Sequence, residues 1–259
     1  MKKFLGVLRY EYSMSIRRRS LLVIMFLFAA FFIYLWADAG VQFQQREDDI
    51  TQALLAEAAQ TVFFLNLFFP VIVGVSSADR AVRDDKLGVR EILRSTGLGN
   101  FVHVLGKYFG VAFSMLTVEL VIVILISTIL VTLSALPLAF VLYSLLAVML
   151  ISAPAIFFVT AFSLACPLVM PVRVYQIMFT GYWYWGNYLS PQVLPTVSNT
   201  LLNASGRFPM IAFFGEKVAT NWASVSHTEA VANILILLGC AALALTAMIA
   251  YLNWREKRA

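Results

Sequence analysis

Long apolar stretches dominate the chain, and polar residues interrupt them only at intervals. A helix needs about 20 apolar residues to cross the hydrocarbon core of a bilayer, and six stretches approach or exceed that length. They are Ser20–Ala37, Leu54–Val75, Tyr108–Leu133, Leu138–Leu164, Val174–Leu189 and Ala230–Asn253. Only a bend containing Pro167 and Pro171 separates the fourth from the fifth, and these prolines end one helix and begin another. The pattern predicts an all-α integral membrane protein with six transmembrane helices.

Two segments outside these stretches have patterns of their own. Apolar residues recur every three or four positions in residues 1–19, which predicts an interfacial helix along the inner leaflet. The simpler alternative is a basic flank of the first span. Residues Ser190–Glu229 keep apolar pairs among their prolines and glycines, and they follow an aromatic run typical of a membrane interface. We expect part of this external segment, which precedes the last span, to re-enter the membrane edge or to cover the external mouth of a cavity.

Composition and charge agree with a membrane protein. The 259 residues are 61% hydrophobic and 13% charged, whereas soluble domains are about 25% charged. With six spans, 16 of the 19 Lys and Arg residues fall on one side, so the positive-inside rule predicts that both termini are cytoplasmic. We expect a multi-pass protein of the cell (plasma) membrane. The net charge of +5 therefore reports topology and does not indicate nucleic-acid binding. We expect residues 1–19 to form the interfacial helix and residues 20–259 a single transmembrane domain.

The sequence lacks the motifs of the common catalytic and metal sites. It has no phosphate-binding glycine loop followed by Lys-Ser/Thr, and no His-Glu-x-x-His. His103 and His227 are predicted on opposite sides of the membrane, and Cys166 and Cys240 lack metal-ligand spacing with either. We therefore expect neither enzymatic activity, nor a bound cofactor, nor a metal in this chain.

Glu119 is the only acid or base deep inside a predicted span. A carboxylate at such a depth costs about 2.5–3.5 kcal/mol on insertion scales. Two interpretations are equally supported: a cavity-lining or proton-sensitive group, and a structural hydrogen bond to a Ser, Thr or Asn on a neighbouring span.

The segment between the second and third predicted spans, Ser77–Lys107, carries ten charges and several apolar residues. It predicts a short amphipathic cytoplasmic helix from about Asp84 to Ser95, which the Gly97-Leu98-Gly99 break follows. The same residues considered alone are equally typical of a charged loop in contact with the cytoplasm.

The order of residues in this segment resembles that of the membrane (permease) subunits of ABC-2 type ABC transporters. In that family, acidic residues precede a glycine, and then come a Glu-Leu-Leu-like block, a turn, and a Gly-Lys pair that opens the third span. The matching positions are Asp84-Asp85-Lys86-Leu87-Gly88, Glu91-Ile92-Leu93, Ser95-Thr96-Gly97 and Leu105-Gly106-Lys107. The N-terminal helix with Arg9 and Glu11 is similar to the elbow helix of the family.

The resemblance implies a permease subunit of an ATP-driven exporter that forms half of the translocation path. Two copies of a separate ABC ATPase subunit would bind ATP and Mg²⁺, and a second permease subunit would complete a homodimer or a related heterodimer in the lipid bilayer. The segment Gly88–Thr96 would be the coupling helix that docks on the ATPase. The residues assigned to docking are Asp85, Gly88, Arg90, Glu91, Ile92, Leu93, Arg94 and Thr96.

Two other functions remain open at this point. An ion- or proton-coupled carrier would use coupling acids and broken helices, for which Glu119 and Pro154 are the indications. A membrane assembly subunit that does not transport would have no ATPase partner. The sequence does not indicate a substrate, because apolar cavity linings suit drugs, peptides and lipids alike.

Overall fold

A computed structural model of the chain describes residues 2–18, 23, 26–31, 33–34, 50–88, 97–218 and 222–258. Every regular element within those ranges is a helix, as the hydropathy pattern predicts. The elements are α1 (Lys2–Ile16), α3 (Ile50–Ser77), α4 (Arg80–Lys86), α6 (Asn100–Leu133), α7 (Ala139–Ala147), the π-helix η2 (Val148–Ser152), α8 (Ala153–Ala165), the 3₁₀-helix η3 (Cys166–Leu168), α9 (Val172–Tyr188), α10 (Arg207–Phe214) and α11 (His227–Glu256).

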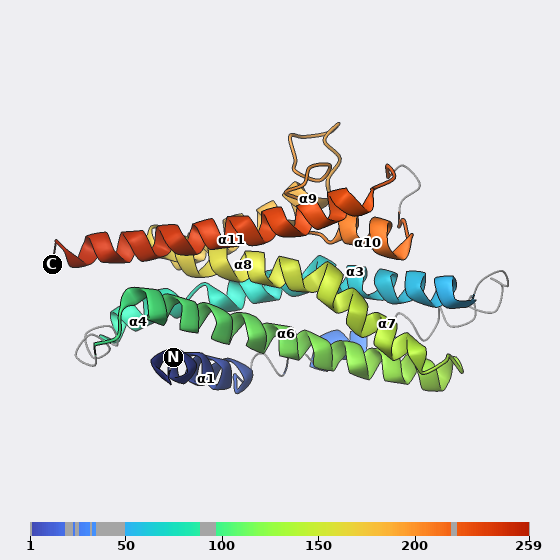
Figure 1. Cartoon of the computed structure of the whole chain (residues 1–259), viewed down its shortest axis with the longest axis horizontal. Coiled ribbons are helices and arrows are strands. Elements are labelled where there is room, and N and C mark those ends of the chain that lie inside the picture. The colour runs from blue at the N-terminus through green and yellow to red at the C-terminus, as the bar shows by residue number, and fades with distance from the viewer. Residues whose placement is uncertain are drawn as a thin grey trace.

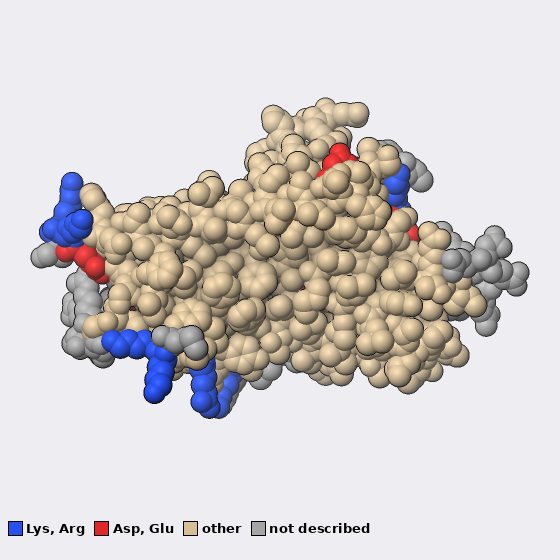
Figure 2. Space-filling view, in the orientation of Figure 1, with Lys and Arg blue, Asp and Glu red and all other residues tan. Residues whose placement is uncertain are grey.

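The long helices run lengthwise through an elongated bundle, and both termini lie toward the end that carries α4 (Figure 1). Among the described residues, four helices are long and apolar enough to cross a membrane: Ile50–Asp84, Asn100–Leu133, Ala139–Leu168 and His227–Glu256. They cover four of the six predicted spans, apart from Leu138 at the start of the fourth. On the face drawn in Figure 2, Lys and Arg gather in the half of the bundle that carries α4 and in a smaller group toward the opposite end, and the middle between these groups is free of them. This distribution fits a protein embedded in a bilayer.

The other two predicted spans are less complete. The helix α9 covers the stretch predicted at Val174–Leu189 except for its last residue, but its 17 residues reach only about 26 Å at 1.5 Å per residue. That is slightly less than the hydrocarbon thickness of about 30 Å. Of the stretch Ser20–Ala37, residues 26–31 and 33–34 are helical, and most of the remainder lies outside the described residues.

The helix α3 forms the centre of the bundle and packs against α7, α8 and α9. Its buried side chains include Val62, Leu65 and Val73, each no more than 1% exposed. From α9, the fully buried Trp183 donates a hydrogen bond from Nε1 to the carbonyl oxygen of Leu67 at 3.0 Å. The largest apolar cluster of the described residues therefore surrounds α3.

Prolines shape the path of the chain through α8 and α9. The π-helix η2 ends at Ser152, two residues before Pro154, which has no N–H to donate and so favours a local change of helical pitch. At Pro167 the chain forms the short helix η3, and α9 begins immediately after Pro171. The predicted break between the fourth and fifth apolar stretches is confirmed.

The segment Ser190–Glu229 contains the short helix α10, which packs against α3, α11 and η2. Its N-cap, Gly206, has φ +82°, and a Cβ atom there would lie 2.3 Å from Ile151 Cγ2. A larger residue would meet both backbone strain and a clash. The segment is thus partly packed into the bundle, and its re-entry into a membrane stays a prediction.

Candidate functional site

The N-terminal helix α1 rests directly on the first turns of α6 (Figure 1). Two glycines one turn apart on α6 permit this approach. A Cβ atom at Gly106 would lie 2.9 Å from Val7 Cβ, and one at Gly110 would lie 2.8 Å from the carbonyl oxygen of Leu8. Small residues spaced four apart commonly allow such close helix packing.

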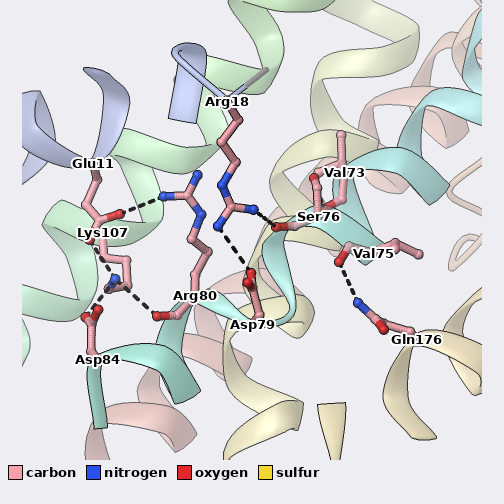
Figure 3. Close-up of polar contacts among 10 residues, drawn as sticks. All are labelled: Glu11, Arg18, Val73, Val75, Ser76, Asp79, Arg80, Asp84, Lys107 and Gln176. Atoms are coloured by element: carbon pink, nitrogen blue, oxygen red, sulfur yellow. Dashed lines mark hydrogen bonds and ion pairs between the residues drawn. The ribbon is translucent and has the colours of Figure 1, made fainter. Parts of the chain in front are cut away.

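Five charged or titratable side chains meet where α1, α4 and α6 converge. We call them the ion cluster: Glu11, Arg80, Asp84, His103 and Lys107. Figure 3 shows all of them except His103. The Lys107 ammonium donates to Glu11 Oε1 at 2.6 Å and lies 2.8 Å from Asp84 Oδ2. Arg80 Nη1 lies 3.5 Å from the second oxygen of Glu11. Lys107 and Arg80 are each only 1% exposed, so the charges of the cluster are compensated within the protein.

The remaining contacts of the ion cluster are weaker. His103 Nε2 lies 3.4 Å from Asp84 Oδ2. Two guanidinium nitrogens of Arg80 and the second ring nitrogen of His103 have no hydrogen-bond partner among the residues that the structure describes. A buried ion pair adds little net stability, because desolvation offsets the attraction, but removing one partner is costly. Such a cluster therefore holds its helices in one relative position.

The residues of the ion cluster come from three separate helices. Glu11 belongs to α1, Arg80 and Asp84 to α4, and His103 and Lys107 to the first two turns of α6. The helices α4 and α6 are the elements on either side of residues 87–99, the segment in which the coupling helix is predicted. The cluster thus connects both ends of that segment to each other and to the N-terminal helix.

The structure describes only part of the predicted docking site. Gly88 ends the described segment with φ +64°, and Asp85 lies in α4, although its side chain is outside the described residues. The other predicted docking residues also fall outside the described ranges: Arg90, Glu91, Ile92, Leu93, Arg94 and Thr96.

The two predicted elbow-helix residues have different environments. Glu11 is 3% exposed and joins the ion cluster, whereas Arg9 is exposed on the surface of α1. The structure has a helix over Lys2–Ile16, whereas its role as an elbow helix and its location at a membrane interface stay predictions.

The sequence by itself does not predict that Arg80, Asp84, His103 and Lys107 form a cluster. One feature of the sequence does indicate charged helix faces here: Arg80 and Asp84 are four residues apart, and so are His103 and Lys107. Residues at this spacing lie on one face of a helix. Each pair therefore marks a charged face at a helix end, although the spacing does not reveal that the two faces meet around Glu11.

Glu119 lies in the middle of α6 and is completely buried. Its carboxyl oxygens have no hydrogen-bond partner of good geometry among the described residues. Ser152 in the π-helix η2 interacts with Glu119, but the Ser152 hydroxyl donates to Asn66 Oδ1 at 3.3 Å. Asn66 in turn donates to the carbonyl oxygen of Ser205 at 2.8 Å. Glu119 thus borders a buried polar network that links α3, η2 and the segment before α10.

The all-helical fold of the described residues, with its four long apolar helices, fits a membrane-embedded protein. No protein-family model and no curated protein matches the sequence. Within the described residues, no group of three or more His, Cys, Asp or Glu side chains is arranged to hold a metal ion. The functional assignment therefore depends on the sequence motif and on the geometry of the ion cluster.

Proposed function

We propose that this chain is the permease subunit of an ABC-2 type ATP-driven exporter, with six spans and both termini in the cytoplasm. The observation that supports this function best is the ion cluster. It joins α1 to the two helices that flank the predicted coupling helix, where force from an ATPase would enter the membrane domain.

The packing around the cluster suits the transmission of movement. Only two residues separate the end of α3 from the start of α4, so a displacement of α4 acts directly on the central helix of the bundle. Lys107 binds carboxylates from both α1 and α4. Because separating these groups would leave buried charges uncompensated, the three helices would move as one unit when the coupling helix is pushed.

The proposal requires partners that supply energy and complete the path. Two copies of an ABC ATPase subunit would bind ATP and Mg²⁺ beneath the cytoplasmic end. A second permease subunit would pack against this one in the bilayer. The exposed face of α11 carries small residues at helical spacing, which would allow close approach of another helix. These residues are Gly239, Ala242, Thr246 and Ala250.

The coupling helix is tested by the double variant Leu93→Ala/Glu91→Arg. If the segment docks on the ATPase, loss of an apolar anchor and reversal of a charge should weaken association by tenfold or more, since interface anchors are worth about 2 kcal/mol or more. The measurement is co-purification of the ATPase together with ATP hydrolysis in reconstituted vesicles.

The matched control makes the same two changes near the end of the bundle opposite α4 (Figure 1). Leu202→Ala/Glu216→Arg alters one leucine and one glutamate in the segment around α10, and it should leave ATPase binding unchanged. Unchanged binding and hydrolysis in Leu93→Ala/Glu91→Arg would show that this segment does not couple the two subunits, and the exporter proposal would lose its main support.

A second candidate function, a proton-coupled carrier that works without an ATPase, is favoured by Glu119. This carboxyl group is fully buried and borders a π-helix, an element that often marks functional sites. Intramembrane acids commonly belong to proton relays. A structural acid in the same place would take no part in proton movement.

Vesicles that contain only the purified chain distinguish the two candidate functions. Under an imposed pH gradient, we expect wild type and Glu119→Gln to dissipate the gradient equally slowly, because a permease without its ATPase does not transport. The variant Glu216→Gln, which changes a residue just after α10, serves as the control for loss of a carboxyl group. Faster dissipation by wild type and Glu216→Gln than by Glu119→Gln would establish the carrier instead.

A further inference from the structure

A cavity of about 780 Å³ lies at the α4 end of the bundle, between the junction of α3 with α4 and the bend that leads into α9. This size is within the range of small-molecule sites, about 300–1,000 Å³. Four cationic side chains line it, from three separate parts of the chain: Arg18, Arg83, Lys86 and Arg173. The only carboxylate among the lining residues is Asp79.

That single carboxylate is already paired. Arg18 Nη2 lies 3.5 Å from Asp79 Oδ1, and Arg18 Nη1 donates to the carbonyl oxygen of Ser76 at 3.0 Å (Figure 3). Arg83, Lys86 and Arg173 form no ion pair with any carboxylate whose side chain the structure describes. The lining therefore has an excess of three positive charges.

The first turn of α9 adds to the positive potential. Pro171, the N-cap of α9, lines the cavity together with Val172 and Arg173, and no side chain caps this helix end. The first N–H groups of a helix lack partners within the helix and carry the positive end of its dipole, and this favours anions nearby. Three independent side chains and one helix end thus present positive charge to the same space.

We propose that this cavity binds a phosphate group, carried either by the headgroup of an anionic membrane lipid or by a soluble phosphate compound. The surroundings favour the lipid. Next to Arg173, the outer face of α9 exposes apolar side chains that suit acyl chains, with Val174 44%, Ile177 75% and Met178 61% exposed. Basic pockets between membrane helices are typical sites for phosphate-bearing headgroups. This site is independent of the proposed exporter function.

The test uses the full-length chain in neutral detergent and measures bound ligand by native mass spectrometry. Three probes are titrated separately: phosphatidylglycerol, zwitterionic phosphatidylcholine and inorganic phosphate. The variant Arg83→Gln/Lys86→Gln/Arg173→Gln removes the unpaired cations and should bind phosphatidylglycerol about a hundredfold more weakly, because each cation near an anionic lipid contributes about a fivefold factor.

The matched control removes three exposed cations that do not line the cavity. Lys2→Gln/Arg17→Gln/Lys257→Gln has the same net charge as the cavity variant and should retain phosphatidylglycerol. Thermal unfolding of both variants checks that folding is preserved, since changes of exposed residues usually lie within about 0.5 kcal/mol. Added salt should weaken the wild-type interaction, because it screens the cations.

Each result is decisive. If the cavity variant loses phosphatidylglycerol while wild type retains it, and wild type retains it well above phosphatidylcholine, the site binds a lipid headgroup. Cavity-dependent binding of inorganic phosphate without lipid retention assigns it to a soluble phosphate. Equal losses in the two triple variants, or full binding by the cavity variant, would overturn the proposal.

Discussion

Lys107→Met is expected to lower the free energy of unfolding by about 3–5 kcal/mol, the usual cost of removing one partner from a buried ion pair. Lys107 is 1% exposed, and its ammonium is the nearest cation to both Glu11, at 2.6 Å, and Asp84, at 2.8 Å. Methionine keeps the aliphatic stem of the side chain but leaves two carboxylates without their main compensation. Denaturant unfolding in detergent micelles measures the change.

Two further variants distinguish the effect of breaking the Glu11–Lys107 ion pair from the effect of removing any lysine. Lys257→Met removes an exposed cation and should change stability by no more than about 0.5 kcal/mol. Glu11→Gln/Lys107→Met removes charges of both signs. It should therefore be more stable than the summed effects of the single variants Glu11→Gln and Lys107→Met predict. Strict additivity would contradict the direct pairing of Glu11 with Lys107.

Gly110→Ala is expected to destabilise the protein by about 1–3 kcal/mol, the usual cost of overpacking a well-packed contact. The new Cβ atom would lie 2.7 Å from Glu11 Cβ and 2.8 Å from the carbonyl oxygen of Leu8. Because one of these neighbours is backbone, only a shift of α1 away from α6 relieves the clash. That shift would also pull Glu11 away from Lys107, so the stability measurement reports on the same junction.

The control is a glycine with open space around it. A Cβ atom at Gly181 in α9 would have nothing within 4 Å, and alanine is favoured over glycine in a helix interior by about 1 kcal/mol. Gly181→Ala should therefore equal or exceed the wild-type stability. If Gly110→Ala behaved like Gly181→Ala, α1 would not rest on α6 as the structure shows.

Together these variants examine the junction on which the proposed coupling depends. Lys107→Met and Gly110→Ala act on the contacts of α1 with α4 and α6, whereas Leu93→Ala/Glu91→Arg acts on the predicted ATPase surface. A permease whose coupling helix works through the ion cluster should lose coupled ATP hydrolysis in both sets of variants, but lose ATPase binding only in the second.

The hydropathy pattern alone determined the helical architecture. Four of the predicted spans lie inside helices that are long enough to cross a membrane, and the break between Pro167 and Pro171 occurs where it is predicted. This succeeds because a membrane helix satisfies its backbone hydrogen bonds within itself and meets lipid directly. Both requirements are local, so a window of about 20 residues contains the information.

The contacts between distant segments were decided only by the tertiary structure. The periodicity of residues 1–19 predicts the helix α1, but it does not show that Glu11 points into the protein toward Lys107, 96 residues away. Similarly, Arg83 and Arg173 share one cavity only because the bend before α9 lies beside α4. Spacing within a helix specifies which residues share a face, whereas the partner of that face depends on how the helices pack, and packing is a property of the whole bundle.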